Sequence, residues 1–64
     1  MTDPSINLVN IKHNAKELQE HLANAQKPSN VRLAEILVIC QEILEDAQHI
    51  KAWAIDKNLE KIND

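Results

Sequence analysis

At 64 residues the chain can form one domain, spanning residues 1–64, and a domain of this size buries only about 60% of its unfolded surface, so its stability is marginal. Ten acidic and seven basic residues give a net charge of −3, and the basic residues are scattered, which argues against nucleic acid as a partner. One cysteine excludes an intramolecular disulfide, and the absence of glycine argues against sheets with tight turns, so we expect an all-α protein.

The amino-terminal segment contains a helix start signal. Asp3 is suited to the N-cap position, and Pro4 is suited to the first helical position, where its missing N–H costs nothing. The segment lacks the basic region and continuous apolar core of a signal peptide, and nowhere does the chain approach the ~20 apolar residues that cross a bilayer. We therefore expect a cytoplasmic protein without membrane contact.

The first predicted helix spans about residues 4–26. Its apolar residues recur at alternating steps of three and four, which places them in one stripe about 100° wide along the helix. The other positions are mostly Asn, Lys, Gln, Glu and His, which suit solvent. The stripe consists of Leu8, Ile11, Ala15, Leu18, Leu22 and Ala25.

The stretch from Gln26 to Asn30, QKPSN, is the only internal break in the helical pattern. Pro28 restricts Lys27 to extended geometry, and Ser29 or Asn30 can cap a following helix. Because short connections place consecutive helices side by side, we expect an antiparallel hairpin. With the turn near Pro28, Lys12 and Lys16 would lie beside the acidic cluster of helix two, which consists of Glu42, Glu45 and Asp46.

The second predicted helix spans about residues 29–62. No glycine or proline interrupts it, and the three-four alternation continues through the apolar run at residues 36–40. The residues that flank this run include no turn former, so a helix is favoured over a strand. The stripe consists of Leu33, Ile36, Cys40, Ile43, Ala47, Ile50 and Ala54.

The apolar face of helix two is too wide and too long for one partner helix. Flanking apolar residues widen it to about 140°, and helix one reaches only to about Ile50. A second copy of the chain would cover the excess, so we predict a homodimeric four-helix bundle. The alternative is a three-helix bundle with a break in helix two near residues 46–49. The predicted dimer or partner interface contains Leu37, Ile39, Leu44, Trp53, Ile55, Leu59 and Ile62.

One group of side chains has the spacing of metal ligands. His13, Glu17 and His21 recur every four residues, so one helix face could offer all three to zinc. Such spacings are also common on solvated helices, so we predict no metal site and no cofactor. The glutamates of helix two, Glu35, Glu42 and Glu45, are expected on its outer side, and no nucleophile has a base beside it.

These patterns together favour a non-catalytic protein–protein interaction module that acts as a homodimer and binds another protein. Trp53 is the only aromatic residue, and tryptophan is enriched at binding hot spots. It could instead cover the core of the second subunit. A metal- or RNA-binding helical bundle is the alternative function, and the acidic charge argues against its RNA version.

Overall fold

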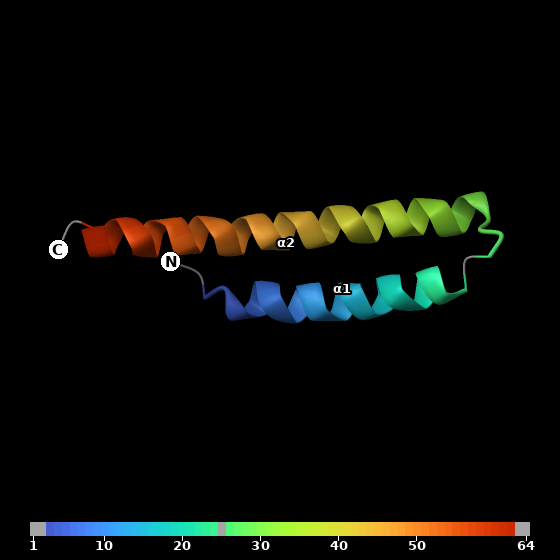
Figure 1. Ribbon diagram of the computed structural model, residues 1–64, viewed down its shortest axis with the longest axis horizontal. Helices are drawn as coiled ribbons and strands as arrows, with labels where there is room; N and C mark the ends of the chain where they lie inside the picture. The colour runs from blue at the N-terminus through green and yellow to red at the C-terminus, as the bar shows by residue number, and fades with distance from the viewer. Residues whose placement is uncertain (1–2, 25, 63–64) are drawn as a thin grey trace.

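The protein is a two-helix hairpin in the computed structural model, which describes residues 3–24 and 26–62, with side chains described as far as residue 60. Helix α1 spans Ser5–Ala23 and helix α2 spans Asn30–Ile62. The helices lie side by side and antiparallel, and α2 continues beyond the start of α1 (Figure 1). The molecule is a rod of 55 × 16 × 15 Å.

The predicted all-α hairpin is confirmed, with small differences at the helix ends. Helix α1 ends at Ala23 rather than near residue 26, and α2 begins at Asn30. Helix α2 continues without a break through residues 46–49. The alternative three-helix arrangement is therefore wrong, because nothing in this segment breaks the helical hydrogen bonds.

The start of α1 is fixed by Asp3 and Pro4. The Asp3 Oδ1 atom accepts a hydrogen bond of 2.9 Å from the Ser5 backbone N–H, and the Pro4 carbonyl accepts one of 3.0 Å from Leu8. Both predicted positions are one residue off, because the N-cap is Pro4 rather than Asp3 and the first helical residue is Ser5 rather than Pro4. The Asp3 carboxylate therefore bonds to the helix start from one residue before the N-cap. The bond from Ser5 to Asp3 satisfies one of the backbone N–H donors that a helix start leaves unpaired.

The turn between the helices is closed by side chains that bond to the backbone. At the end of α1, the Asn24 carboxamide donates to the Glu20 carbonyl at 2.9 Å. At the start of α2, the Ser29 hydroxyl accepts from the Arg32 N–H at 3.2 Å, which confirms Ser29 as the predicted cap. These bonds end one helix and begin the next within a few residues.

The hairpin encloses very little apolar surface. Among the described hydrophobic residues only Ile39 is buried, with 6% of its surface exposed, and the single buried polar residue is Asn14, with 8% exposed. Other residues along the helix contact are half-buried. A packed core residue normally touches neighbours on all sides, and two helices alone cannot provide this.

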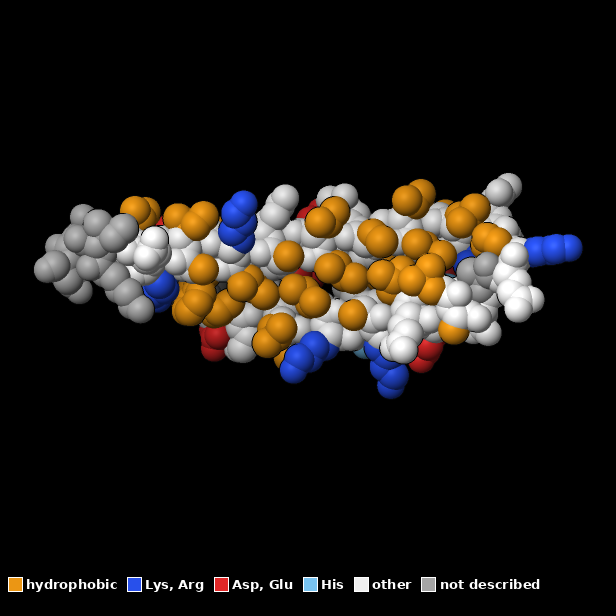
Figure 2. All heavy atoms as spheres, in the orientation of Figure 1, with side chains coloured by type: hydrophobic (Ala, Val, Ile, Leu, Met, Phe, Trp, Pro, Cys, Tyr) orange, Lys and Arg blue, Asp and Glu red, His pale blue; other side chains and the backbone are white. Residues whose placement is uncertain are grey.

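The two sides of the hairpin differ in chemistry. At about 100° per residue, the apolar residues of both helices fall on the same side of the line along which the helices meet. Figure 2 shows their side chains as a continuous band over α1 and α2. We call this side the apolar face; it contains Leu8, Ile11, Ala15, Leu18 and Leu22 of α1 and Leu33, Ile36, Cys40, Ile43, Leu44 and Ala47 of α2.

Candidate functional site

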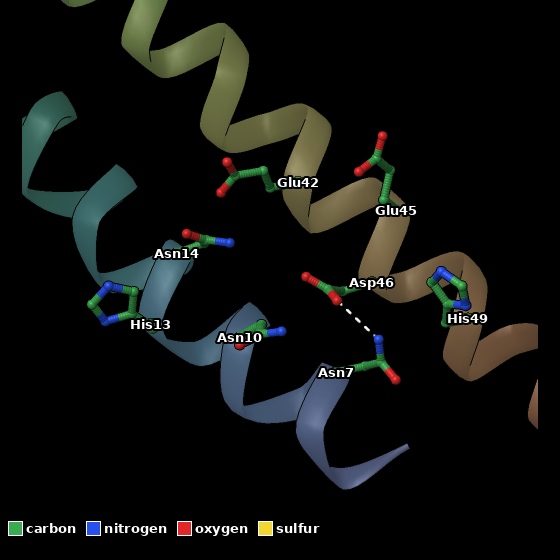
Figure 3. Close-up of a pocket in the computed structure, with 8 residues that line it drawn as sticks. All are labelled: Asn7, Asn10, His13, Asn14, Glu42, Glu45, Asp46 and His49. Atoms are coloured by element: carbon green, nitrogen blue, oxygen red, sulfur yellow. Dashed lines mark hydrogen bonds between the residues drawn. The ribbon is translucent and has the colours of Figure 1, made fainter. Parts of the chain in front are cut away.

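The opposite side of the hairpin contains a hollow of about 420 Å³ between the two helices. We call it the polar groove. Figure 3 shows that the side chains around it carry polar or charged groups and come from both helices. The groove is lined by Asn7, Asn10, His13 and Asn14 of α1 and by Glu42, Glu45, Asp46 and His49 of α2.

Helical spacing explains why these residues meet. Steps of three and four residues return a side chain to the same side of a helix, and Asn7, Asn10 and Asn14 follow that pattern in α1. Glu42, Glu45 or Asp46, and His49 follow it in α2. The same rule that gathers the apolar residues on one side therefore gathers carboxamides and carboxylates on the other.

One hydrogen bond crosses the groove and ties the helices together. The Asn7 carboxamide donates to Asp46 Oδ1 at 2.9 Å, and the pair is partly buried (Figure 3). A hydrogen bond to a charged group typically contributes about 1.5–3 kcal/mol. This bond fixes how the amino-terminal half of α1 lies against α2.

Asn14 lies deeper in the groove than the other lining residues. It is the only buried polar residue among those described, and its side chain points towards α2 (Figure 3). No hydrogen bond joins it to another residue of the groove (Figure 3). No fully enclosed side-chain N or O atom in the described part of the chain lacks a hydrogen-bond partner, so the Asn14 carboxamide still reaches the open groove.

A second polar contact joins the helices near the turn. His21 Nε2 lies 3.3 Å from Glu35 Oε2, and the Arg32 guanidinium donates to the His21 carbonyl at 3.3 Å. The Arg32 bond satisfies a carbonyl in the last turn of α1, where such acceptors lose their helical partners. The contacts of His21 with Glu35 and Arg32 thus join the two helices at the end of the polar side that is nearest the turn.

The three predicted zinc-ligand candidates are not brought together. His13 Nε2 lies 3.2 Å from Glu17 Oε1 on the exposed surface of α1, whereas His21 turns to contact α2. Within the described residues, no three His, Cys, Asp or Glu side chains are grouped so that they could hold a metal ion.

The predicted pairing of lysines with the acidic cluster is wrong. Lys12 and Lys16 are exposed, and neither forms an ion pair with a described acidic residue. Both lie on the side of α1 away from α2, and Asn7 takes the place beside Asp46. The asparagine repeat of α1 was the available signal, but asparagine at helical spacing is hard to distinguish from a solvated surface.

The three glutamates of helix two are exposed, as predicted, but they lie beside α1 rather than on the side away from it. Glu42 and Glu45 line the polar groove, and Glu35 contacts His21 across the helix contact. Their position beside α1 depends on the rotation of α2 about its own axis, which the apolar stripe alone fixes only loosely because that stripe is wide.

The predicted interface residues fall into three groups. Ile39 is already buried within the hairpin, whereas Leu37, Leu44, Ile55 and Leu59 are exposed. Trp53 is half-buried and lines a hollow of about 400 Å³ with Pro4, Leu8 and Ile50. Helix α1 thus reaches Trp53 rather than only Ile50. The side chain of Ile62 lies outside the described residues.

Comparisons with protein-family models, with curated proteins and with solved structures find no match for this chain. Neither described helix contains a stretch long and apolar enough to cross a membrane.

Proposed function

We propose that the protein is a non-catalytic helical interaction module that acts as a homodimer, in which two apolar faces pack together as a four-helix bundle. The observation that supports this is the continuous apolar face over both helices, combined with a hairpin interior that encloses Ile39 alone among the described hydrophobic residues. A contiguous exposed apolar band of this kind is unusual on a soluble monomer and marks an interaction surface.

A second copy of the chain is the partner that fits this face best. In a two-fold dimer, each apolar face meets an identical one, so the lengths and widths of the two surfaces match. The acidic residues of the polar groove lie on the other side and stay apart in the dimer. Burial of apolar surface contributes about 25 cal/mol per Å², and only such added burial makes a hairpin of this size stable.

The module would bind a further protein through surfaces that the dimer leaves free. The carboxyl-terminal part of α2, residues 54–62, extends beyond α1 and carries the exposed side chains of Ile55 and Leu59 (Figure 1). Trp53 lies where this extension begins. Aromatic residues beside exposed aliphatic ones are typical of the centre of a binding surface.

Two matched substitutions test the dimer. Leu44 and Val38 are both in α2 and are equally exposed, at 56% and 57%, but Leu44 belongs to the apolar face and Val38 lies on the other side. In the dimer, Leu44→Glu would bury an unpaired charge, which costs several kcal/mol, whereas Val38→Glu would leave its charge in water. We expect Leu44→Glu to abolish dimerisation and Val38→Glu to preserve it, as measured by sedimentation equilibrium.

Circular dichroism of both variants separates loss of dimer from loss of fold. If the hairpin requires its second copy, Leu44→Glu will also lose helicity, while Val38→Glu will not. A stable helical monomer of 7.3 kDa for the unsubstituted protein at micromolar concentration would overturn the proposal. Equal behaviour of the two variants would also overturn it.

A further inference from the structure

We infer that the two copies in the dimer point in the same direction, with α1 of each copy packed against α2 of the other. The inference rests on the proposed homodimer and adds the alignment of its subunits. In this alignment the α2 extensions of both copies, residues 54–62, lie at the same end of the bundle. The register of the helices, a hollow on α1 and the positions of the lysines support it.

Symmetry allows two ways of placing one apolar face on another along its whole length. A two-fold axis parallel to the rods keeps each residue at its own level and sets α1 of each copy against α2 of the other. An axis across the rods reverses one copy, and it sets α1 against α1 and α2 against α2. The bonds from Asn7 to Asp46 and from Arg32 to His21 show which residues of the two helices share a level. The contacts in the two alignments can therefore be compared.

Helix α1 has a hollow of about 480 Å³ on the apolar face. Its lining includes Leu18 and Leu22, and the small side chain of Ala15 leaves room beside them. On α2, the leucines at the same levels are Leu33 and Leu37, which are 45% and 71% exposed. In the same-direction alignment these leucines of one copy lie over the hollow of the other copy and can fill it.

The reversed alignment leaves this hollow open. The middle of α2 is near Asp46, and only the start of α1 reaches that level, where Asn7 bonds to Asp46. Reversal about this level therefore overlaps the two α1 helices only in their amino-terminal halves. The carboxyl-terminal half of α1, which contains the hollow, would lie beyond the end of the other α1.

Lys51 also distinguishes the two alignments. It follows Leu44 by seven residues, so it lies on the same apolar side of α2, two turns further along. Lys51 is level with the start of α1, so in the same-direction alignment it lies near the Asp3 carboxylate of the other copy. Reversal would instead set it against the apolar residues around Cys40, and an unpaired charge buried there costs free energy.

The charges at the edges of the apolar face agree with the same-direction alignment. Lys12 and Lys16 are the charged residues of α1 nearest this face, and Figure 2 shows basic side chains along the outer edge of α1. Gln41 of α2 is level with Lys12 and donates a hydrogen bond to Glu45, whose carboxylate points away from α1 (Figure 3). The same-direction alignment thus places Lys12 of one copy beside Glu45 of the other.

Distances between spin labels on the two copies test the alignment. Val31 is exposed near the turn and lies on the polar side, so a label at Val31→Cys does not disturb the apolar face. In the same-direction dimer, two such labels should be about 30 Å apart, because only the width of the bundle separates them. In the reversed dimer they should be about 50 Å apart, because most of the length of α2 also separates them. Double electron–electron resonance measures this distance.

A label at His49→Cys is the matched control. His49 lies on the polar side near the middle of α2, so its two copies are close in both alignments, and a short distance there shows that the labelled protein is a dimer. Cys40→Ala removes the native thiol from both labelled proteins. Sedimentation confirms that Cys40→Ala is still a dimer.

A charge exchange tests the contact between Lys12 and Glu45. Lys12→Glu and Glu45→Lys should each weaken dimerisation several-fold at low salt, because each brings like charges together. The two changes combined should restore it. Lys27→Glu makes the same charge change in the turn and should leave dimerisation nearly unchanged.

A distance of about 50 Å between the Val31 labels, with a short distance between the His49 labels, would overturn the inference and leave the proposed dimer intact. Equal weakening by Lys12→Glu and Lys27→Glu, without rescue by Glu45→Lys, would also overturn it. A protein without any dimer in sedimentation would overturn the proposed function, and the inference with it.

Discussion

Ile39 and Asn14 lie at the centre of the contact between the helices, and they are chemically unlike. Ile39 provides the one buried apolar side chain among those described, with 6% of its surface exposed, and Asn14 provides a buried carboxamide. A change of Ile39 to a charged residue would therefore unfold the hairpin itself, so it reports on folding and not on dimerisation. Leu44, which is exposed in the hairpin, is the residue whose substitution isolates the dimer interface.

Asp3 makes the stability of α1 depend on pH. The backbone N–H of Ser5, and secondarily its side chain, bond to the Asp3 carboxylate and lower its pKa below the ordinary value of 3.8. A lowered folded-state pKa contributes stability that is present above the ordinary pKa and is lost as the pH falls through the folded-state value. We expect the amino-terminal turn of α1 to fray in that acidic range, with Asp3 titrating below 3.8 by NMR.

The control for this prediction is Asp3→Asn. Asparagine keeps a cap acceptor but does not titrate, so the variant should lack this component of the acid-induced loss of helicity. Asp3→Ala, which has no acceptor in its side chain, should show lower helicity than Asp3→Asn at every pH. Titration of Asp3 at its ordinary pKa would mean that the cap is not formed in solution.

At the scale of the helices, α1 and α2 have different roles, because α2 is longer than α1 and only part of it lies against α1. The 19 residues of α1 lie along α2, and Pro4 and Leu8 at the start of α1 line a hollow together with Trp53. Beyond this point α2 continues alone to Ile62 (Figure 1). The fold therefore requires α2 up to Trp53, and the extension is free to serve binding.

Two truncations separate these roles. Removal of residues 54–64 should leave the hairpin folded, because α1 does not reach beyond Trp53. Removal of residues 52–64 also deletes Trp53 and should cost about 1–3 kcal/mol more, because the half-buried indole that lines the hollow with Pro4 and Leu8 is lost. Urea denaturation followed by circular dichroism measures both.

Equal stability of the two truncated proteins would contradict the packing of Trp53 against α1. Unfolding of the longer truncated protein would mean that the extension is part of the fold, and it could then not be a surface reserved for a partner.

At the scale of the whole molecule, a rod of 55 × 16 × 15 Å with one apolar face cannot be very stable alone. If dimerisation supplies the missing burial, folding and association are linked, and the melting temperature depends on protein concentration. We expect the melting temperature to rise by several degrees for each tenfold increase in concentration. Calorimetry over two decades of concentration measures this, and a constant melting temperature would indicate a hairpin that is stable as a monomer.

Val38→Glu and Leu44→Glu serve again as matched proteins in that experiment. The Val38 variant should keep the concentration dependence. The Leu44 variant should melt at a lower temperature, without dependence on concentration if any helical structure remains.

The sequence by itself determined the two helices, the connection at Pro28 and their antiparallel arrangement. These depend on local signals, namely the three-four spacing of apolar residues, the caps at Asp3 and Ser29, and the absence of glycine and proline from α2. Each signal acts within a few residues along the chain, so neighbours in the sequence are sufficient to predict it.

Only the tertiary structure decided which residues of the two helices meet. Asp46 bonds to Asn7, and the rotation of α2 about its own axis brings Glu42 and Glu45 into the polar groove. An apolar stripe more than 100° wide tolerates several rotations of each helix at similar cost. The rotation that the helices adopt is one in which polar side chains such as Asn7 and Asp46 pair with each other. The sequence of one helix cannot predict this rotation, because the partner of each side chain lies on the other helix.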